Sequence, residues 1–551
     1  MTLALPKENK DLNTLGFELV MPVELNDVDV DRLLPSFIER CVKYGRVSPS
    51  RVDPDAYPEH LAALKDSASV IGFDEGNGQA VLDGWLRASV VKIGSGSRRR
   101  LGERMDYVRP LTVAAYRSGL PQSQSRNRRA DAVAYAILRE EYEKRGSKRP
   151  EASISTDVCE SLGRGVDIGE SPWDNPLYDG TPVDITELLA LRFLETFPPN
   201  PAEGKSKANA LEGFALPGSI SDLGADLFGI LNVTAKGWST IQTISALKSI
   251  LAVRLYQLPL RVGIALQQAL DGSHINDLVA GADNPVQMYC DFTRRRGGQS
   301  DELARLSVAR DLELLTTSMG NRLLLRSIQQ ATQLTASHGH VVHLPPEERL
   351  PMLADLVSDP EIDMALRMQV MSVETSLDDS DSGREAKQFI QSLRDSGLSG
   401  AEQVRRVLVE GLRKRGHENQ VKWFWSTGGL NPKGGSHPYA LLSGTMVRST
   451  WRYTPAEELI SILVSACFYE ASGIQAPQLP INELLTRLRR RFGIVIDRPL
   501  SDNDSVDARA GAAENLVAFK RQLQHLGCFT SLSDDFSVQY VTPPLGNTVK
   551  Q

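Results

Sequence analysis

Seven basic side chains near the C-terminus are the strongest candidates for binding a charged ligand. Four arginines fall within five positions, and three further basic residues follow on the next predicted helix. Arginine and lysine bind phosphate oxygens, and each such contact weakens as salt rises. We therefore predict a nucleic-acid-binding surface made of Arg487, Arg489, Arg490, Arg491, Arg509, Lys520 and Arg521. A charged helix face is also typical of a solvated scaffold or a protein-binding module, and both alternatives stay open.

Three of the eight histidines form the one histidine cluster of the sequence: His338 and His340 flank a glycine, and His343 follows. A metal site would need carboxylate or cysteine ligands in reach as well, and the cysteines show no zinc spacing. The cluster lies at a predicted helix end before Pro345, where histidine interacts favourably with the helix dipole. We predict no metal, no cofactor and no catalytic residue.

One N-terminal pattern resembles the carboxylate–lysine arrangement of metal-dependent nucleases. Asp74 and Glu75 follow a predicted strand, and Lys92 lies on a later one. Two-metal catalysis needs converging carboxylates, but Val90 occupies the place of the acid expected two residues before the lysine. Because a tight turn over residues 74–78 explains the same residues, a nuclease site is kept as an alternative.

The segment around residue 430 joins aromatic residues to a glycine-rich stretch. Trp423, Phe424 and Trp425 predict a strand, whose aromatic side chains are more often core residues than a platform for bases. Residues 428–435 contain Lys433 and have the composition of a phosphate loop, but they lack its Gly-Lys-Ser/Thr ending. We exclude a P-loop and predict a flexible loop.

Composition limits the class of protein. The 551 residues are enough for several domains, and 41% are hydrophobic and 24% charged. The net charge of −7 argues against a chain that coats nucleic acid, so DNA contact must come from local basic patches. Five widely spaced cysteines favour buried thiols in a reducing cytosol. With no predicted signal peptide or spanning helix, we expect a cytoplasmic protein without membrane contact.

The last hundred residues have the element order of a winged helix. Apolar positions at helical spacing predict helices that begin near Pro455, Pro480 and Ala508. Residues 494–496 are a predicted short strand between the second and third helices. Residues 532–541 are predicted to be a turn and strand that form the wing.

Several local features make sharper predictions. Ala130 to Lys144 predicts an amphipathic helix, and Ser399 is a predicted N-cap. Gly527 is a predicted left-handed C-cap. The arginines of residues 487–491 are expected to remain largely outside, and Asn515 is expected on the outer face of the third helix.

These patterns predict a predominantly α, multi-domain protein with a small mixed α/β N-terminal region. Strands are predicted at 19–23 and 67–73 and within 85–93, and almost wholly helical periodicity begins near residue 216. The predicted divisions are a mixed α/β N-terminal domain (1–150), a loop-rich connection (151–215), a helical domain (216–420), an aromatic and glycine-rich connector (421–454) and a winged-helix domain (455–543).

C-terminal segments of the chain resemble accessory proteins of bacterial anti-phage defence islands. They are Ser426-Thr427-Gly428-Gly429, residues 438–444, Thr450-Trp451-Arg452-Tyr453, Arg491-Phe492-Gly493-Ile494 and residues 532–536. The chain looks most like a non-catalytic component of the methylation-associated defence system, and the phosphorothioation-dependent restriction systems are similar in style. The resemblance covers the last quarter and carries over no catalytic residue. It implies antiviral defence and an assembly role beside an ATPase or nuclease partner.

Together these observations predict a non-enzymatic subunit of a bacterial phage-defence complex. It is expected to contact double-stranded DNA, a partner ATPase or nuclease, or both, through the C-terminal winged helix. Two alternatives remain: a stand-alone DNA-binding regulator, and a metal-dependent nuclease with its site in the N-terminal domain.

Overall fold

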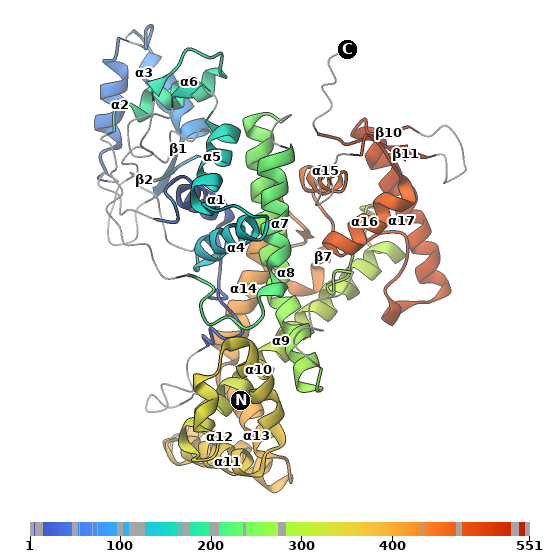
Figure 1. Ribbon diagram of the computed structural model, residues 1–551. Coiled ribbons are helices and arrows are strands. Elements are labelled where there is room, and N and C mark those ends of the chain that lie inside the picture. The colour runs from blue at the N-terminus through green and yellow to red at the C-terminus, as the bar shows by residue number, and fades with distance from the viewer. Residues whose placement is uncertain are drawn as a thin grey trace.

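The computed structural model shows a mostly helical protein, as the apolar periodicity predicts (Figure 1). It describes residues 5, 15–46, 53, 55–68, 70–73, 75–95, 103–109, 127–163, 165–167, 177–197, 209–234, 238–273, 283–431, 434–469, 476–530 and 539–545. One contiguous hydrophobic core extends through these residues from Leu5 to Val541.

Two long helices, α8 (Thr240–Leu270) and α9 (Gln299–Leu334), pack against each other at the centre of the molecule (Figure 1). A capping box starts α8, because Ser239 Oγ accepts from Gln242 N and the Gln242 side chain accepts from Ser239 N. By length and composition alone α8 passes as a membrane-spanning helix. However, 94% of its most apolar window is buried inside the protein, so α8 is the central core helix of this fold.

The N-terminal region packs on one side of α8 (Figure 1). Its described elements are α1 (Val30–Val42), α2 (Tyr57–Lys65), α3 (Gly78–Trp85), β1 (Val91–Ser95), β2 (Glu103–Val108), α4 (Ala130–Lys144), α5 (Pro150–Leu162), β3 (Val166–Asp167), β4 (Leu177–Tyr178), α6 (Ile185–Leu194) and α7 (Ser221–Gly229). The bounds of α4 are those predicted. Strands β1 and β2 pair antiparallel, as do β3 and β4.

The predicted strands of this region are mostly wrong. Residues 19–23 form a turn in which Val20 N and Met21 N donate to Phe17 O, and their apolar side chains enter the core from that turn. The described part of 67–73 consists of turns and bends. Within 85–93, Trp85 ends α3 and a π-helical turn precedes β1, so only the last residues are extended. Short apolar runs do not distinguish a strand from other buried segments.

A group of helices below α8 and α9 in Figure 1 completes the middle of the chain. They are α10 (Pro346–Asp355), α11 (Pro360–Thr375), α12 (Asp381–Asp395) and α13 (Gly400–Gly411), and α14 (Glu418–Thr427) returns to the centre. Ser399 caps α13 as predicted, since its hydroxyl accepts from Glu402 N at 3.2 Å.

The predicted strand at 421–427 is wrong, because these residues belong to α14. Trp423 and Phe424 are fully buried beside α8, and Trp423 Nε1 donates to Leu255 O at 2.9 Å. Packing against α8 therefore overrides the strand propensity of three consecutive aromatic residues.

Residues 455–545, the C-terminal unit, lie on the opposite side of α8 from the N-terminal region (Figure 1). After β6 (Leu442–Ser443) and β7 (Arg452–Tyr453), the unit contains α15 (Glu457–Ala466), β8 (Leu479–Pro480), α16 (Ile481–Phe492), β9 (Ile494–Val495), α17 (Val506–His525), β10 (Phe529–Thr530) and β11 (Tyr540–Val541). The three helices begin within two residues of their predicted starts. Strand β11 pairs antiparallel with both β10 and β8, and residues 532–538 of the predicted wing lie outside the described residues.

Candidate interaction surface of the C-terminal unit

The C-terminal unit is joined to the middle of the chain by a parallel strand pair. Strand β9 follows α16 directly and pairs with β5 (Met288–Tyr289). The turn into β9 is made by Gly493, whose φ of +69° ends α16 in the left-handed region. Gly527 ends α17 with the same φ, which confirms its predicted conformation. These two turns set the directions of α16 and α17.

Arg491 points into the protein, so the prediction that it remains outside is wrong. Its Nε and Nη2 donate to Asp226 Oδ1 at 2.9 and 2.7 Å, and its Nη1 donates to Ala466 O. Asp226 on α7 is 3% exposed and also accepts from Arg254 Nε at 2.7 Å. Burial alone would lower the pKa of Arg491, but the charge of Asp226 outweighs it and raises that pKa.

The carbonyl end of α16 is also capped by the core. Arg254 Nη1 donates to Arg491 O at 2.9 Å, and Gln257 Nε2 donates to Phe492 O at 2.7 Å. Asn284 Nδ2 donates to Arg491 O at 3.1 Å. Buried side chains of α8 and of the segment before β5 thus satisfy carbonyls that a helix end leaves open. The basic end of α16 is a docking point within the fold.

The other three arginines of α16 are half-buried or exposed, and each has a carboxylate nearby. Arg487 Nε donates to Glu483 at 2.7 Å, and its Nη1 donates to Cys467 O at 3.0 Å. Arg489 and Arg490 lie 3.9 and 2.9 Å from Asp283. Nearby acids therefore balance much of the positive charge that the sequence shows on this helix.

The three predicted basic residues of α17 differ in their exposure and in their ion pairs. Arg509 is exposed and donates to Asp504 at 2.6 and 2.7 Å, and this hydrogen bonding raises the pKa of Arg509. Lys520 is partly buried, whereas Arg521 is exposed, and the described residues include no carboxylate paired with Arg521. The structure thus does not gather the seven predicted basic residues into one patch.

Asn515 is fully buried, so its predicted place on the outer face is wrong. Its Nδ2 donates to Cys290 O at 2.8 Å and to Ile496 O at 3.0 Å, and its Oδ1 accepts from Phe292 N at 2.7 Å. One amide therefore holds α17 against the backbone on both sides of the β5–β9 pair. The sequence does not show that Asn515 is buried, because its hydrogen-bond partners are backbone groups of distant segments.

The outward face of α17 carries an apolar stripe, which we call the α17 stripe: Val506, Ala510, Ala513 and Val517. These positions repeat at steps of four and three residues, so they share one face of the helix. Val506 is 83% exposed and Val517 is 49% exposed. Exposed charges of both signs flank the stripe, from Asp507, Arg509, Glu514 and Arg521. The outward face is therefore apolar with a balanced charge.

A basic segment that the sequence analysis missed lies beside this face. Arg294, Arg295 and Arg296, the arginine loop, connect β5 to α9 and are all exposed. Arg295 Nη1 donates to Glu514 Oε1 on α17 at 2.7 Å. Three consecutive arginines before two glycines were a visible signal, but their position next to α17 depends on the β5–β9 pairing.

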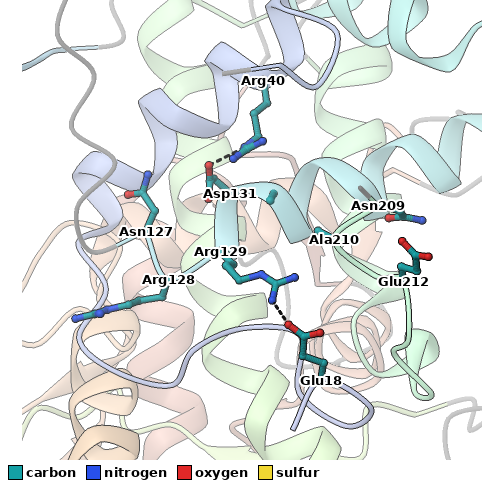
Figure 2. A pocket seen from close by; sticks show the side chains of 10 residues that line it. Glu18, Arg40, Asn127, Arg128, Arg129, Asp131, Asn209, Ala210 and Glu212 are labelled. Carbon is teal, nitrogen blue, oxygen red and sulfur yellow. Dashed lines mark hydrogen bonds and ion pairs between the residues drawn. The ribbon is translucent and has the colours of Figure 1, made fainter. Parts of the chain in front are cut away.

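A cleft of about 710 Å³ lies in the N-terminal region (Figure 2). Figure 2 shows Arg40 turned toward Asp131, at 2.7 Å, and Arg129 turned toward Glu18. Arg128 instead binds Asp27 and Glu24. Because carboxylates already pair with these arginines, the cleft offers no excess of either charge.

One residue of the nuclease alternative, Asp74, lies outside the described residues, and Lys92 is exposed on β1. Within the described ranges, no three His, Cys, Asp or Glu side chains are placed to hold a metal ion. His338 Nε2 instead lies 3.4 Å from Asp359 at the start of α11, where Asp359 caps the helix.

Comparison with known proteins identifies one family. A family model described as "Methylation-associated defense system protein MAD7" matches residues 10–545. No curated protein matches the chain. The match confirms the defence-system resemblance and extends it from the last quarter to nearly the whole chain.

Proposed function

The chain belongs to the family of the methylation-associated defense system protein MAD7, and we propose that it is a non-enzymatic assembly subunit of that system. In this proposal the C-terminal unit is a winged helix that binds another protein of the same system through the α17 stripe. An ATPase or nuclease subunit is the expected partner.

The arrangement of short strands supports the winged-helix part of the proposal. In chain order the unit has helix α15, strand β8, helix α16, strand β9, helix α17, and then strands β10 and β11. Strand β11 lies between β10 and β8 in an antiparallel sheet, so β11 returns beside the strand that directly precedes α16. This leaves α17 at the outer edge of the unit (Figure 1).

The observation that carries the functional proposal is the composition of the outward face of α17. Exposed valine and alanine at helical spacing form an apolar contact area with polar flanks, which is the pattern of protein interfaces. A DNA-binding helix would instead meet phosphates with unpaired cations. Here Asp504 holds Arg509, and Asp226 holds Arg491. A partner protein fits this face better than a duplex does.

The test is capture by the full-length chain of the other proteins of its defence system, each expressed and purified separately. The double variant Val506→Glu/Val517→Glu places charge in the α17 stripe, and we expect it to weaken binding by at least about tenfold, since a buried unpaired charge is costly at an interface. Ile241→Glu is the matched control, because Ile241 is 60% exposed on α8, outside the C-terminal unit. Equal binding by the stripe variant and wild type would refute the proposal.

DNA contact is the second candidate function, favoured by the exposed Arg490 and Arg521 and by the arginine loop. On this alternative the full chain binds a 20-base-pair duplex with an affinity that falls steeply with salt. Arg490→Ala/Arg521→Ala would reduce the salt slope by about one unit for each phosphate that these side chains neutralise. A duplex that binds wild type and this variant equally would remove these two residues from the DNA alternative.

A further inference from the structure

We propose that the arginine loop, residues 294–296, is the basic rim of the α17 interface and selects a partner protein whose surface is acidic beside an apolar patch. This inference rests on the proposed function and specifies the chemistry of the partner. It adds residues from the middle of the chain to an interface that the sequence locates entirely in the C-terminal unit.

The loop is held rigidly at its base. The carboxylate of Asp291 is 1% exposed and accepts from Thr293 N, Thr293 Oγ1, Arg294 N and Ser300 Oγ at 2.6–3.1 Å. At the other end, Gly297 N donates to Asp301 Oδ2 at 3.0 Å. The backbone that carries the three guanidinium groups is therefore preorganised, which reduces the entropy lost on binding.

The same contacts that dock α17 place the loop beside this helix, next to Glu514, which flanks the α17 stripe. Phe292 N donates to Asn515, and Arg295 pairs with Glu514 one residue earlier on α17. The helices also approach closely, since a Cβ added at Gly511 would lie 2.7 Å from the Cβ of Gln299 at the start of α9. The loop and the first half of α17 thus form a continuous surface.

The loop leaves positive charge available for a partner. Arg295 is neutralised by Glu514, but no carboxylate of the described residues pairs with Arg294 or Arg296. A partner that covers the α17 stripe would bring its own edge over these two arginines. Acidic side chains at that edge satisfy them and increase the rate of association by electrostatic steering.

A protein fits this combination better than a nucleic acid does. Asp502 and Asp507 are exposed at the start of α17, whereas the exposed Asp504 and Glu514 pair with Arg509 and Arg295. Asp502 and Asp507 would lie near the evenly spaced phosphates of a duplex and repel them. A folded partner can place acidic residues opposite the arginine loop alone and leave the acidic end of α17 uncovered.

The experiment measures association and dissociation rates between the full-length chain and each purified protein of its defence system, at low and high salt. Arg294→Glu/Arg296→Glu is expected to slow association by about tenfold at low salt and to flatten its salt dependence, with little change in the dissociation rate. Val506→Glu/Val517→Glu is expected to speed dissociation. Arg384→Glu/Arg413→Glu is the matched control, because it makes the same change in net charge at exposed arginines of α12 and of the segment after α13.

The two proposals fail in different ways. If the loop variant keeps wild-type rates while the stripe variant weakens binding, the basic rim is wrong and the assembly function stands. If the stripe variant keeps wild-type rates with every protein that binds, or if none binds, the assembly function is wrong and the rim inference is wrong with it. If the loop variant loses only affinity for a 20-base-pair duplex, the loop is a DNA site and the inference is overturned.

Discussion

The docking of α16 on the core makes a sharp prediction about two glycines with the same backbone conformation. Gly493 and Gly527 both have a φ of +69° at a helix end. A left-handed conformation costs an L-residue about 1–2 kcal/mol, so alanine is strained at both positions. Only the space around them differs. A Cβ at Gly527 would meet no heavy atom within 4 Å, whereas a Cβ at Gly493 would lie 1.8 Å from Val286 O.

The magnitude follows from these contacts. Gly527→Ala should lower the free energy of unfolding by about 1–2 kcal/mol, which is the conformational term alone. Gly493→Ala must also displace the backbone before β5, and overpacking of this kind costs about 1–3 kcal/mol more. The shift would break the 2.7 Å hydrogen bond from Met288 N to Gly493 O, a further loss of about 1 kcal/mol. We therefore expect a loss of about 3–6 kcal/mol for Gly493→Ala.

Urea unfolding followed by tryptophan fluorescence and circular dichroism measures both variants against wild type. In native-state hydrogen exchange, Gly493→Ala should reduce the protection of the backbone amides of Met288 and Cys290 first, because these amides donate to Gly493 O and Val495 O. Equal destabilisation by the two variants would show that Val286 does not contact the turn. The docking of α16, and with it the placement of α17 beside the arginine loop, would then be wrong.

Two further predictions concern ion pairs of the core. Asp226→Asn removes the buried carboxylate that pairs with both Arg254, which is 3% exposed, and Arg491, so we expect the free energy of unfolding in urea to fall by about 3–5 kcal/mol. A loss no larger than that of Asp222→Asn would contradict this, because Asp222 also lies near Arg254 but is 44% exposed. For Asp31, burial alone would raise the pKa, but the charge and hydrogen bond of Lys248 outweigh it and hold the pKa below its usual range. The folded state thus favours the ionised form of Asp31. The contribution of this ionised carboxylate to the free energy of unfolding is complete above the unfolded pKa of about 3.9, and it disappears as pH falls through the folded pKa. Unfolding midpoints of wild type and Asp31→Asn should therefore differ at pH 7 and converge in acid, whereas a constant gap would contradict the assignment.

Local features of the chain were predictable because their causes lie within one or two helical turns. The bounds of α4, the cap at Ser399 and the left-handed Gly527 depend on apolar spacing, a hydroxyl near a free N–H, and a residue without Cβ. The starts of α15, α16 and α17 were predicted for the same reason. The family resemblance was also present in the sequence, although it extends further than the C-terminal segments that suggested it.

Only the tertiary structure decided what each helix face meets. Periodicity shows which residues share a face, but a face becomes buried or exposed according to elements far away in the chain. Arg491 turns inward because Asp226, 265 positions earlier, supplies its counter-charge, and Asn515 is buried because Cys290 and Phe292 supply backbone partners. Trp423 is helical because α8 covers it. The sequence alone determined the helices of the C-terminal unit, while long-range contacts decided that Arg491 docks α16 on the fold and that valines and alanines of α17 face outward.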